Sequence, residues 1–280
     1  MKILVTGGAG FVGTNLIKLL DKSNNKVYSI DNYSIGSTRN HFDDVEYIDD
    51  NVLNIQNYNI DFDIIYHLAA LSRIQPSFSD PSLFFENNTV GTQKVLEYAK
   101  KVKSKVIYSG SSSMHHDPSL SPYAMSKFLG EELCKLYKFS FHLDVDIVRF
   151  YNVYGPYEIL EGDWAAVIGK WRFLIDQGLP ITIVGDGNQR RDFTHIDDIV
   201  DGLIRISTKK SNKFIWELGS GKNYSINDVF ALFKNKFDCN CEYIDEQKGN
   251  YRETLRVNND AIDELGWSPN GSLEDYISSL

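Results

Sequence analysis

The sequence predicts an α/β protein in which a doubly wound parallel sheet is joined to a smaller α+β substrate-binding lobe. Two observations predict the sheet. Short apolar runs alternate with longer amphipathic segments through the first half of the chain, as strands alternate with helices when both faces of a parallel sheet are covered. A glycine-rich turn follows the first apolar run directly. After Gly155 the alternation loosens, which indicates the second lobe.

The predicted sheet strands are short apolar runs, and the helices between them carry apolar residues at helical spacing. Strands are expected at Lys2–Thr6, Lys26–Ile30, Val45–Ile48, Asp63–His67, Lys105–Ser109 and Val145–Phe150. Helices are expected at Phe11–Leu20, Pro81–Lys101 and Ser121–Phe139.

The second half predicts fewer elements and contains no nucleotide motif of its own, so we expect it to supply the substrate pocket. The pattern indicates a helix over Ala165–Gln177, a helix from near Ile196, a strand at Phe214–Leu218 and a helix over Ser225–Lys236 with Ser225 as N-cap. The expected division is a nucleotide-binding domain of residues 1–152 and about 193–217, and a substrate lobe of about 153–192 and 218–280.

Composition excludes several classes of protein. The 280 residues carry a formal net charge of −9 and are 42% hydrophobic, which is typical of a soluble globular protein. The acidic balance argues against nonspecific binding to nucleic acid or to anionic membranes, since both need a basic face. No apolar run reaches the roughly 20 residues of a membrane span, and the N-terminus is unlike a signal peptide.

The cysteines point to the cytoplasm and away from a metal site. The chain has 3 of them, Cys134, Cys239 and Cys241, which is too few for a disulfide framework and suits a reducing compartment. Cys239 and Cys241 have no nearby Cys or His to complete a zinc site. We therefore expect a cytoplasmic protein without a metal.

The glycine-rich turn has the pattern of a dinucleotide-binding site of the Rossmann type. Gly7, Gly10 and Gly13 follow the first strand and open the first helix; in this pattern the glycines allow a tight turn, close approach of a pyrophosphate and close helix packing. Asp31 ends the second strand, near the expected spacing of ~20 residues. Its carboxylate can bind the ribose hydroxyls of NAD and repel the 2′-phosphate of NADP. The alternative is a glycine turn without a ligand.

A tyrosine and a lysine lie one turn apart at the start of a predicted helix. Tyr123 and Lys127 therefore share one face, so Lys127 can approach both Tyr123 and a bound nicotinamide ribose. A nearby ammonium favours phenolate, which can exchange a proton with a sugar hydroxyl. Ser111–Ser113 follow the fifth strand, at the edge where ligands bind to such sheets. The alternative is a capped amphipathic helix without catalytic chemistry.

Together these motifs resemble the extended short-chain dehydrogenases/reductases of the NAD-dependent epimerase/dehydratase family, whose members act on nucleotide-sugars. The resemblance covers nearly the whole chain. It rests on VTGGAGFVG (5–13), DN (31–32), HLAA (67–70), NNTVGT (87–92), YSGSSS (108–113), SPYAMSK (121–127), RFYNVYGP (149–156), GDGNQRRDFTHIDDI (185–199) and LGWSP (265–269).

The resemblance implies roles for individual residues and implies NAD as the cofactor, with no metal. The implied catalytic residues are Tyr123, Lys127 and Ser111. The implied cofactor contacts are Gly7, Gly10, Phe11, Val12, Gly13, Asp31, Asn32, Asn51, Val52, Leu68, Ala69, Ala70, Asn88 and Ser109, besides Tyr123 and Lys127. Asn88 would also brace the sheet edge. The implied substrate contacts are Ser112, Ser113, Asn152, Arg191, Arg252 and Thr254.

Three departures from the family pattern affect the expected site. The loop MHHDPSLSP between Ser113 and Tyr123 is shorter than usual, so a more open pocket is expected. Asn51 stands where the family often has an Asp that contacts adenine. An expected arginine near residue 247 is replaced, and Lys248 or Arg252 is expected to take over phosphate binding.

The serine loop and Asn152 indicate which reaction to expect. The loop lacks the Asp-Glu pair of the related 4,6-dehydratases, and uronate-specific epimerases usually have Thr where this chain has Asn152. The resemblance therefore favours a 4-epimerase of a UDP-hexose or UDP-N-acetylhexosamine that acts through a transient 4-keto sugar. The alternatives are a 4-ketosugar reductase, another nucleotide-sugar epimerase, or a catalytically silent NAD-binding regulatory protein.

The family also implies an assembly and a specificity residue. In similar members the helices matching Pro81–Lys101 and Ser121–Phe139 pair across a four-helix bundle, so a two-fold homodimer is expected. The apolar positions that would serve the core and this interface are Leu129, Leu133, Leu136 and Phe139. Thr254 matches the position that gates space beside the C2 substituent, and its small size predicts that N-acetylated sugars are accepted.

Overall fold

The computed structural model describes residues 1–208 and 210–280. Its centre is a seven-stranded sheet in the order β11-β6-β5-β4-β1-β2-β3, in which every neighbouring pair is parallel. The strands are β1 (Lys2–Thr6), β2 (Lys26–Asp31), β3 (Val45–Asp49), β4 (Ile64–His67), β5 (Lys105–Ser111), β6 (Val145–Phe150) and β11 (Ile215–Leu218). The predicted parallel sheet is confirmed.

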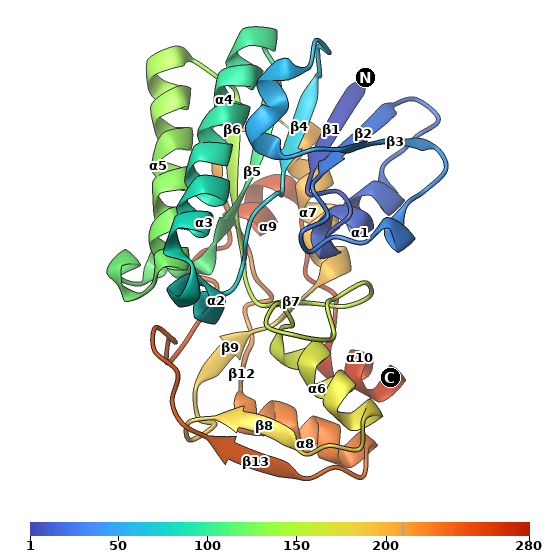
Figure 1. The fold of residues 1–280 in the computed structure, drawn as a ribbon, viewed down its shortest axis with the longest axis vertical. Coiled ribbons are helices and arrows are strands. Elements are labelled where there is room, and N and C mark those ends of the chain that lie inside the picture. The colour runs from blue at the N-terminus through green and yellow to red at the C-terminus, as the bar shows by residue number, and fades with distance from the viewer. Residues whose placement is uncertain (209) are drawn as a thin grey trace.

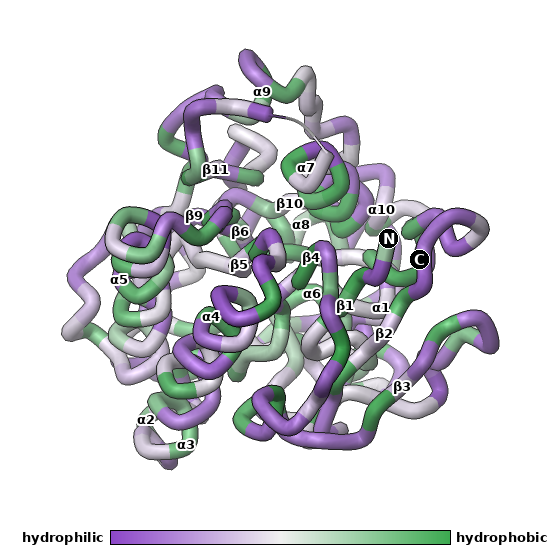
Figure 2. Tube along the Cα trace, turned by 90° about the horizontal axis from the view of Figure 1, so that it is seen from above, coloured by the Kyte–Doolittle hydropathy of each residue, from purple (hydrophilic) through white to green (hydrophobic). Residues whose placement is uncertain are grey.

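Helices cover both faces of the sheet, so its strands are buried on both sides and consist of continuous apolar runs. One face carries α1 (Phe11–Leu19), α7 (Ile196–Thr208) and α9 (Asp260–Leu265), and the other carries α4 (Gly91–Val102) and α5 (Pro122–Phe141). Figure 2, seen from above, shows the strands running between these two helix layers. The predicted doubly wound arrangement is therefore confirmed.

The predicted helix Pro81–Lys101 is present but is not regular along its length. It consists of α3 (Pro81–Phe85), a π-helical turn (Glu86–Val90) and α4. A π-helical turn inserts extra backbone into a helix and often occurs beside functional sites. Here it carries Asn88, which contacts the loop after β4. A shorter helix, α2 (Ile74–Ser79), precedes it.

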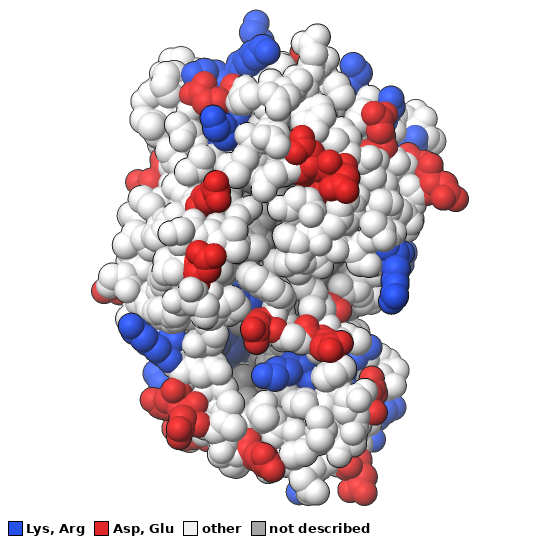
Figure 3. Space-filling view, in the orientation of Figure 1, with Lys and Arg blue, Asp and Glu red and all other residues white. Residues whose placement is uncertain are grey.

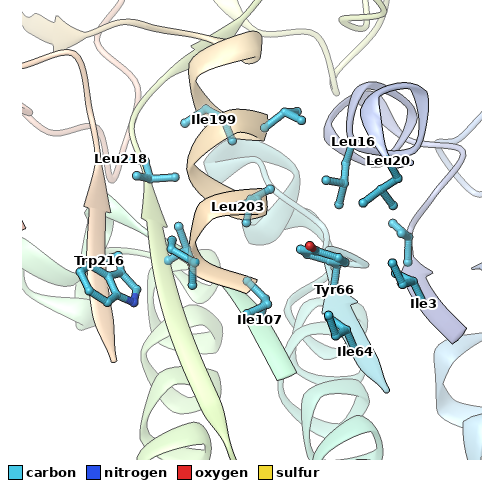
Figure 4. Close-up of a cluster of buried hydrophobic side chains, with 14 of the residues drawn as sticks. Ile3, Leu16, Leu20, Ile64, Tyr66, Ile107, Ile199, Leu203, Trp216 and Leu218 are labelled. Carbon is cyan, nitrogen blue, oxygen red and sulfur yellow. The ribbon is translucent and has the colours of Figure 1, made fainter. Parts of the chain in front are cut away.

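Apolar packing fixes α1 and α7 on the sheet. Figure 4 shows Leu16 of α1, Leu20 directly after α1, and Ile199 and Leu203 of α7 packed over the sheet residues, among them Tyr66. Burying one such side chain fully contributes about 1.5–3 kcal/mol. The sheet and its helices therefore form a stable support for the loops at the carboxyl ends of the strands.

The smaller lobe lies below the carboxyl ends of the sheet strands in Figure 1. It contains α6 (Val167–Asp176), α8 (Ile226–Lys236) and α10 (Leu273–Ser279) around a separate apolar cluster. Three two-stranded sheets complete it: β7 (Val153–Tyr154) with β10 (Thr194–His195), β8 (Ile181–Val184) with β13 (Cys241–Ile244), and β9 (Arg190–Asp192) with β12 (Asn223–Ser225). The predicted N-cap Ser225 is confirmed and forms a capping box with Asp228.

The division into two domains stays a prediction, but the structure refines where its parts lie. Residues 260–265 were expected in the substrate lobe, yet α9 and Trp267 pack in the same apolar cluster as α1 and α7. The Trp267 indole donates a hydrogen bond to the Asp198 carbonyl oxygen at 2.8 Å. Among the described residues, no helix is long and apolar enough to cross a membrane.

Candidate active site

A cavity of about 920 Å³ lies between the carboxyl ends of the sheet strands and the smaller lobe. Its volume is within the usual range of about 300–1,000 Å³ for ligand sites. The turn after β1, the end of β2, the loops after β4 and β5 and the 247–254 segment of the lobe all line it. Figure 3 shows the surface hollowed at this waist, with Lys and Arg side chains at the rim.

The glycine turn has the shape that a pyrophosphate needs. At Gly13 an added Cβ would lie 2.2 Å from the carbonyl oxygen of Gly7, so only glycine allows α1 to approach the turn. At Gly10 an added Cβ would meet only one atom within 4 Å and would otherwise point into open space. The first N–H groups of α1, at Phe11 and Val12, begin at this point and line the cavity. A helix N-terminus in this position favours an anion.

Asp31 lies at the carboxyl end of β2 and lines the same part of the cavity. One carboxylate oxygen accepts a hydrogen bond from the Ala9 N–H at 3.0 Å, and the other accepts one from the Tyr33 N–H at 2.9 Å. Burial raises the pKa of Asp31, and these two backbone hydrogen bonds offset the rise. The carboxylate is therefore held in one orientation, with lone pairs left for ribose hydroxyls.

Most other predicted cofactor contacts also line the cavity: Asn32, Asn51, Val52, Leu68, Ala69, Ala70 and Ser109. The Asn51 side chain accepts a hydrogen bond from the Leu53 N–H and so caps the short helix that follows. Its amide nitrogen stays available to the cavity. The glycine turn, the helix N-terminus and Asp31 together fit a dinucleotide.

Asn88 and His67 act behind this surface. The Asn88 side chain is 1% exposed and exchanges two hydrogen bonds with the backbone of Leu71, at 2.8 and 2.9 Å, while a third reaches Ser126. His67 bridges Thr6 and Thr92 through its two ring nitrogens. Burial and the charge of Lys127 lower the pKa of His67 to about 3, so its ring is neutral. Both residues connect the loop after β4 to its neighbours, as predicted for the bracing role of Asn88.

The predicted triad residues meet at the end of β5. Ser121 caps α5, which places Tyr123 in the first turn and Lys127 one turn later. The Tyr123 hydroxyl donates a hydrogen bond to Ser111 Oγ at 3.2 Å, and the Lys127 ammonium donates one to the Ser109 carbonyl oxygen at 2.5 Å. All of these side chains line the cavity.

The electrostatics of the tyrosine differ from the expectation that Lys127 controls it. Burial raises the pKa of Tyr123, and the hydrogen bond with Ser111 and the positive charge of Arg73 lower it. Burial also lowers the pKa of Lys127, to about 8. In the described residues the cation that acts on the phenol is Arg73, from the loop after β4.

Arg73 is held in place by the segment that enters α6. Its Nε donates a hydrogen bond to the Trp164 carbonyl oxygen at 2.8 Å. The Trp164 ring stacks on Phe84 with centroids 6.0 Å apart, and Phe84 meets the edge of Tyr123 at 6.5 Å. Arg73, Trp164 and Tyr123 therefore line one part of the cavity together, and Phe84 packs behind the two rings.

The predicted substrate contacts are placed unequally. Ser112, Ser113, Asn152, Arg191 and Thr254 line the cavity. The structure does not bring Arg252 to them: its side chain is 63% exposed and pairs with Asp186 at 3.0 Å. Lys248 likewise lies over the Phe78 ring at 4.9 Å, outside the cavity. Neither of the two predicted substitutes, Lys248 and Arg252, lines the cavity.

Arg191 and Asn152 both line the cavity and are both held by hydrogen bonds. Arg191 donates to the Arg190 carbonyl oxygen at 2.9 Å, which leaves most of its N–H groups for a ligand. Burial lowers the pKa of Arg191 to about 10, so it stays protonated at neutral pH. The Asn152 amide donates to Thr254 Oγ1 at 3.0 Å and so fixes both side chains.

Sequence reasoning missed three polar residues that line the sugar end: Arg73, Glu158 and Tyr251. Glu158 is 7% exposed and pairs with Arg172 at 3.0 Å, but its second carboxylate oxygen has no hydrogen-bond partner. These residues stand outside the motifs that carry the family resemblance. Of the three, only Arg73 had a signal in the sequence, because it lies three residues after the HLAA motif.

The two histidines of the shortened loop are packed against other parts of the protein. His115 Nε2 donates a hydrogen bond to Glu217 Oε1 at 3.0 Å, and Glu217 also accepts hydrogen bonds from Arg149 and Tyr151. His116 stacks on Tyr251 with ring centroids 4.0 Å apart. The loop that carries Ser111–Ser113 is thereby anchored on both sides. No cluster of potential metal ligands occurs among the described residues.

Comparison with known sequences agrees with this geometry. The sequence profile described as the NAD dependent epimerase/dehydratase family matches residues 3–219. A putative UDP-glucose 4-epimerase of Methanocaldococcus jannaschii is 31% identical, over 99% of this chain and 96% of its own. Relatives with decarboxylase names also match.

Solved structures show the same fold across nearly the whole chain. A UDP-glucuronic acid 4-epimerase of Bacillus cereus, in complex with UDP-glucuronic acid and NAD, has a TM-score of 0.88 at 31% identity and covers 99% of this chain and 96% of its own. A UDP-N-acetylglucosamine 4-epimerase of Methanobrevibacter ruminantium, in complex with UDP-N-acetylmuramic acid, has a TM-score of 0.89 at 28% identity with the same coverage.

Proposed function

The chain belongs to the NAD dependent epimerase/dehydratase family, and from this premise we propose that it is a nucleotide-sugar 4-epimerase with NAD as its cofactor. One observation carries the proposal. The hydrogen-bonded pair of Tyr123 and Ser111 lines the same cavity as the glycine turn and Arg191. A nucleotide-sugar whose diphosphate lies at Arg191 would bring its sugar to this pair. The preferred substrates are a UDP-hexose or a UDP-N-acetylhexosamine.

In this proposal the chain's own residues hold the reactants and move one proton. When bound, NAD supplies the reversible oxidation of the sugar carbon. Tyr123, as phenolate, accepts the proton of the C4 hydroxyl and later returns it. Ser111 shares its hydrogen bond with the same oxygen, and the positive charge of Arg73 favours the phenolate. Lys127 lines the same cavity, with its ammonium on the Ser109 carbonyl oxygen. Rotation of the 4-keto sugar between the two proton transfers inverts C4.

The serine loop favours epimerisation over loss of water. Ser111–Ser113 are followed by Met114 and His115, and none of these carries a carboxylate. Glu158 does line the cavity, but its first carboxylate oxygen is engaged by Arg172 and Tyr276. It is therefore placed to accept a hydrogen bond rather than to transfer a proton freely.

The test is to incubate the purified protein separately with UDP-glucose, UDP-N-acetylglucosamine and UDP-glucuronic acid and to follow the products by NMR. We expect the C4 epimer of a neutral sugar to accumulate to equilibrium, without net consumption of NADH. A 4-ketosugar reductase would instead leave all three sugars unchanged and would consume NADH stoichiometrically only when a UDP-4-ketosugar is supplied. Absence of turnover with all three substrates, and with a UDP-4-ketosugar plus NADH, would favour a regulatory protein.

Thr254 supports acceptance of N-acetylated sugars. It lines the cavity, is 6% exposed and accepts hydrogen bonds from Asn152 and from the Asp192 N–H. A small side chain held back by these bonds leaves room beside it. We therefore include UDP-N-acetylglucosamine and UDP-N-acetylgalactosamine among the proposed substrates.

We further propose that the protein is a homodimer that pairs through α4 and α5. These helices lie together on one outer flank of the molecule in Figure 1. Leu136 and Phe139 of α5 are 49% and 63% exposed, and Val90, just before α4, is 39% exposed. Exposed apolar side chains on outward-facing helices are the usual material of a two-fold interface.

Sedimentation of the parent at micromolar concentration is expected to give twice the 31.9 kDa chain mass. Phe139→Glu should convert it to the monomer, because a carboxylate would be buried in the interface. Leu179→Glu is the matched control, since Leu179 is 51% exposed on the smaller lobe. A parent that sediments as a monomer would contradict the proposal.

A further inference from the structure

Three residues that line the cavity each carry a buried side-chain atom without a hydrogen-bond partner: Ser113 Oγ, Glu158 Oε2 and the Tyr251 hydroxyl. Ser113 is 3% exposed, Glu158 7% and Tyr251 9%. Buried polar groups in proteins are almost always paired. Unpaired groups that share one cavity therefore indicate where a polar ligand completes the hydrogen bonds.

The Tyr251 ring is rigidly placed by contacts between the two parts of the molecule. His116, from the shortened serine loop, stacks on it with centroids 4.0 Å apart and planes 8° from parallel. The preceding residues also reach across: the Gln75 amide donates to the Lys248 carbonyl oxygen at 2.9 Å. A Cβ on Gly249 would lie 2.9 Å from the Leu120 carbonyl oxygen. The 247–251 segment thus closes the side of the cavity that the short loop leaves open.

The hydroxyl of Tyr251 lies near the groups that line the same part of the cavity. Burial raises the pKa of Tyr251 to about 12, and the nearby phenol of Tyr123 adds to the rise. The hydroxyls of Ser121 and Ser113, close to the phenol but outside normal hydrogen-bond geometry, and the charge of Arg191 oppose the rise. Tyr251 is therefore a neutral hydrogen-bond donor at physiological pH.

We propose that Tyr251 and Ser113 form a specificity site that hydrogen-bonds a polar substituent of the sugar ring, a hydroxyl or an amide carbonyl, next to the reacting carbon. This inference rests on the proposed function of the same cavity. The substituent would exchange hydrogen bonds with both hydroxyls at once, since each can donate and accept. Tyr251 comes from the smaller lobe and Ser113 from the sheet, so a bound sugar would also connect the two parts.

The proposal explains how a short serine loop can coexist with a closed sugar site. The nine residues MHHDPSLSP between Ser113 and Tyr123 contribute His116 as a support rather than as a ligand contact. In this proposal Tyr251 makes the contact with the sugar instead, and the stacked His116 ring holds Tyr251 in place. An aromatic side chain suits this role because it has few rotatable bonds to order on binding.

The experiment measures binding of UDP-N-acetylglucosamine and of UDP to the NAD-loaded protein by calorimetry. Tyr123→Phe serves as the background, because it should prevent turnover during the titration. Adding Tyr251→Phe or Ser113→Ala should weaken UDP-N-acetylglucosamine binding about 3- to 10-fold, the usual effect of one lost neutral hydrogen bond. Binding of UDP alone should not change. Tyr243→Phe, at a tyrosine that is 58% exposed, is the matched control.

A series of UDP-glucose analogues, each lacking one ring hydroxyl, identifies the contacted group. The effect of Tyr251→Phe should disappear for one analogue and persist for the others. Equal weakening of UDP and of the UDP-sugar would overturn the proposal, because it would place Tyr251 at the nucleotide or in a purely structural role. So would an unchanged affinity for every ligand.

The two proposals fail in different ways. If the parent shows no epimerase turnover but the Tyr251→Phe effect on UDP-sugar binding is present, the specificity site stands and the reaction is wrong. If the parent epimerises the sugar but Tyr251→Phe changes neither KM nor affinity, the reaction stands and the specificity site is wrong. If the parent binds no UDP-sugar, both fall.

Discussion

The cofactor end and the sugar end of the cavity are built in different ways. At the cofactor end, Gly7–Gly13 and Asp31 follow neighbouring parallel strands, β1 and β2. At the sugar end, Arg73, Glu158 and Tyr251 come from three loops that are distant in sequence. A parallel sheet aligns the carboxyl ends of its strands, so a motif at one strand end is placed by its own strand. The sugar end depends on how the smaller lobe packs against the sheet.

This difference predicts that one end can be altered without the other. The largest effect on activity is expected at Tyr123, where the cofactor end and the sugar end meet. Tyr123→Phe removes the hydroxyl that donates to Ser111 and keeps the ring contact with Phe84. Loss of a positioned acid/base should lower kcat about 10²- to 10⁴-fold, while NAD affinity, measured by fluorescence titration, stays near that of the parent.

Ser111→Ala provides the comparison, with a smaller loss of kcat expected because neighbouring hydroxyls or water can replace its hydrogen bond. Near-full activity of Tyr123→Phe would show that the proton is moved by another group. A parallel loss of NAD affinity would show instead that the two ends are not independent.

The second prediction concerns the cofactor end alone. We expect the parent to bind NAD about 10- to 100-fold more tightly than NADP, because a 2′-phosphate beside the Asp31 carboxylate is a like-charge contact. Asp31→Asn should reduce this ratio and leave the affinity for UDP unchanged. The measurement is a titration of NAD and of NADP into the parent and into Asp31→Asn. Equal affinities of the parent for NAD and NADP would refute the prediction.

The third prediction tests whether Arg73 controls the phenol. The charge of Arg73 lowers the pKa of Tyr123 against the effect of burial, so Arg73→Gln should raise that pKa. If phenolate is the active form, the acid limb of the kcat/KM profile moves to higher pH. Activity should fall about tenfold at neutral pH for a shift of about one pKa unit and recover in alkaline buffer.

Arg73→Lys retains the charge, so the acid limb of its kcat/KM profile should stay close to that of the parent. The other groups that interact with Tyr123 are Ser111, Tyr251 and Tyr108, and all stay unchanged in these variants. A loss of activity that is the same at every pH would assign Arg73 a packing role beside Trp164 instead.

The smallest expected effect concerns the sugar substituent. Thr254→Tyr should fill the space beside the C2 position and displace the bonds to Asn152 and Asp192. Overpacking of this kind costs about 1–3 kcal/mol, which lowers kcat/KM for UDP-N-acetylglucosamine relative to UDP-glucose by roughly tenfold or more. An unchanged ratio in competition assays would show that Thr254 is not the gate.

The fold was predictable because its signals are local. The alternating strands and helices, the glycine turn and the Ser225 N-cap each depend on residues close together in the chain. The pairs β8–β13 and β9–β12 were not predictable in the same way. Each pair joins strands from distant segments of the chain. All four strands are too short to show the alternation of apolar and polar residues that would predict a strand.

The sequence by itself determined the parallel sheet, the cofactor end of the cavity and the positions of Tyr123, Lys127 and Ser111 on it. The tertiary structure decided which charged and polar groups surround them. It placed Arg73 near Tyr123 and left Arg252 on the surface with Asp186. The reason is that a side chain's neighbours across a cavity depend on the packing of two lobes, and no short motif encodes that packing.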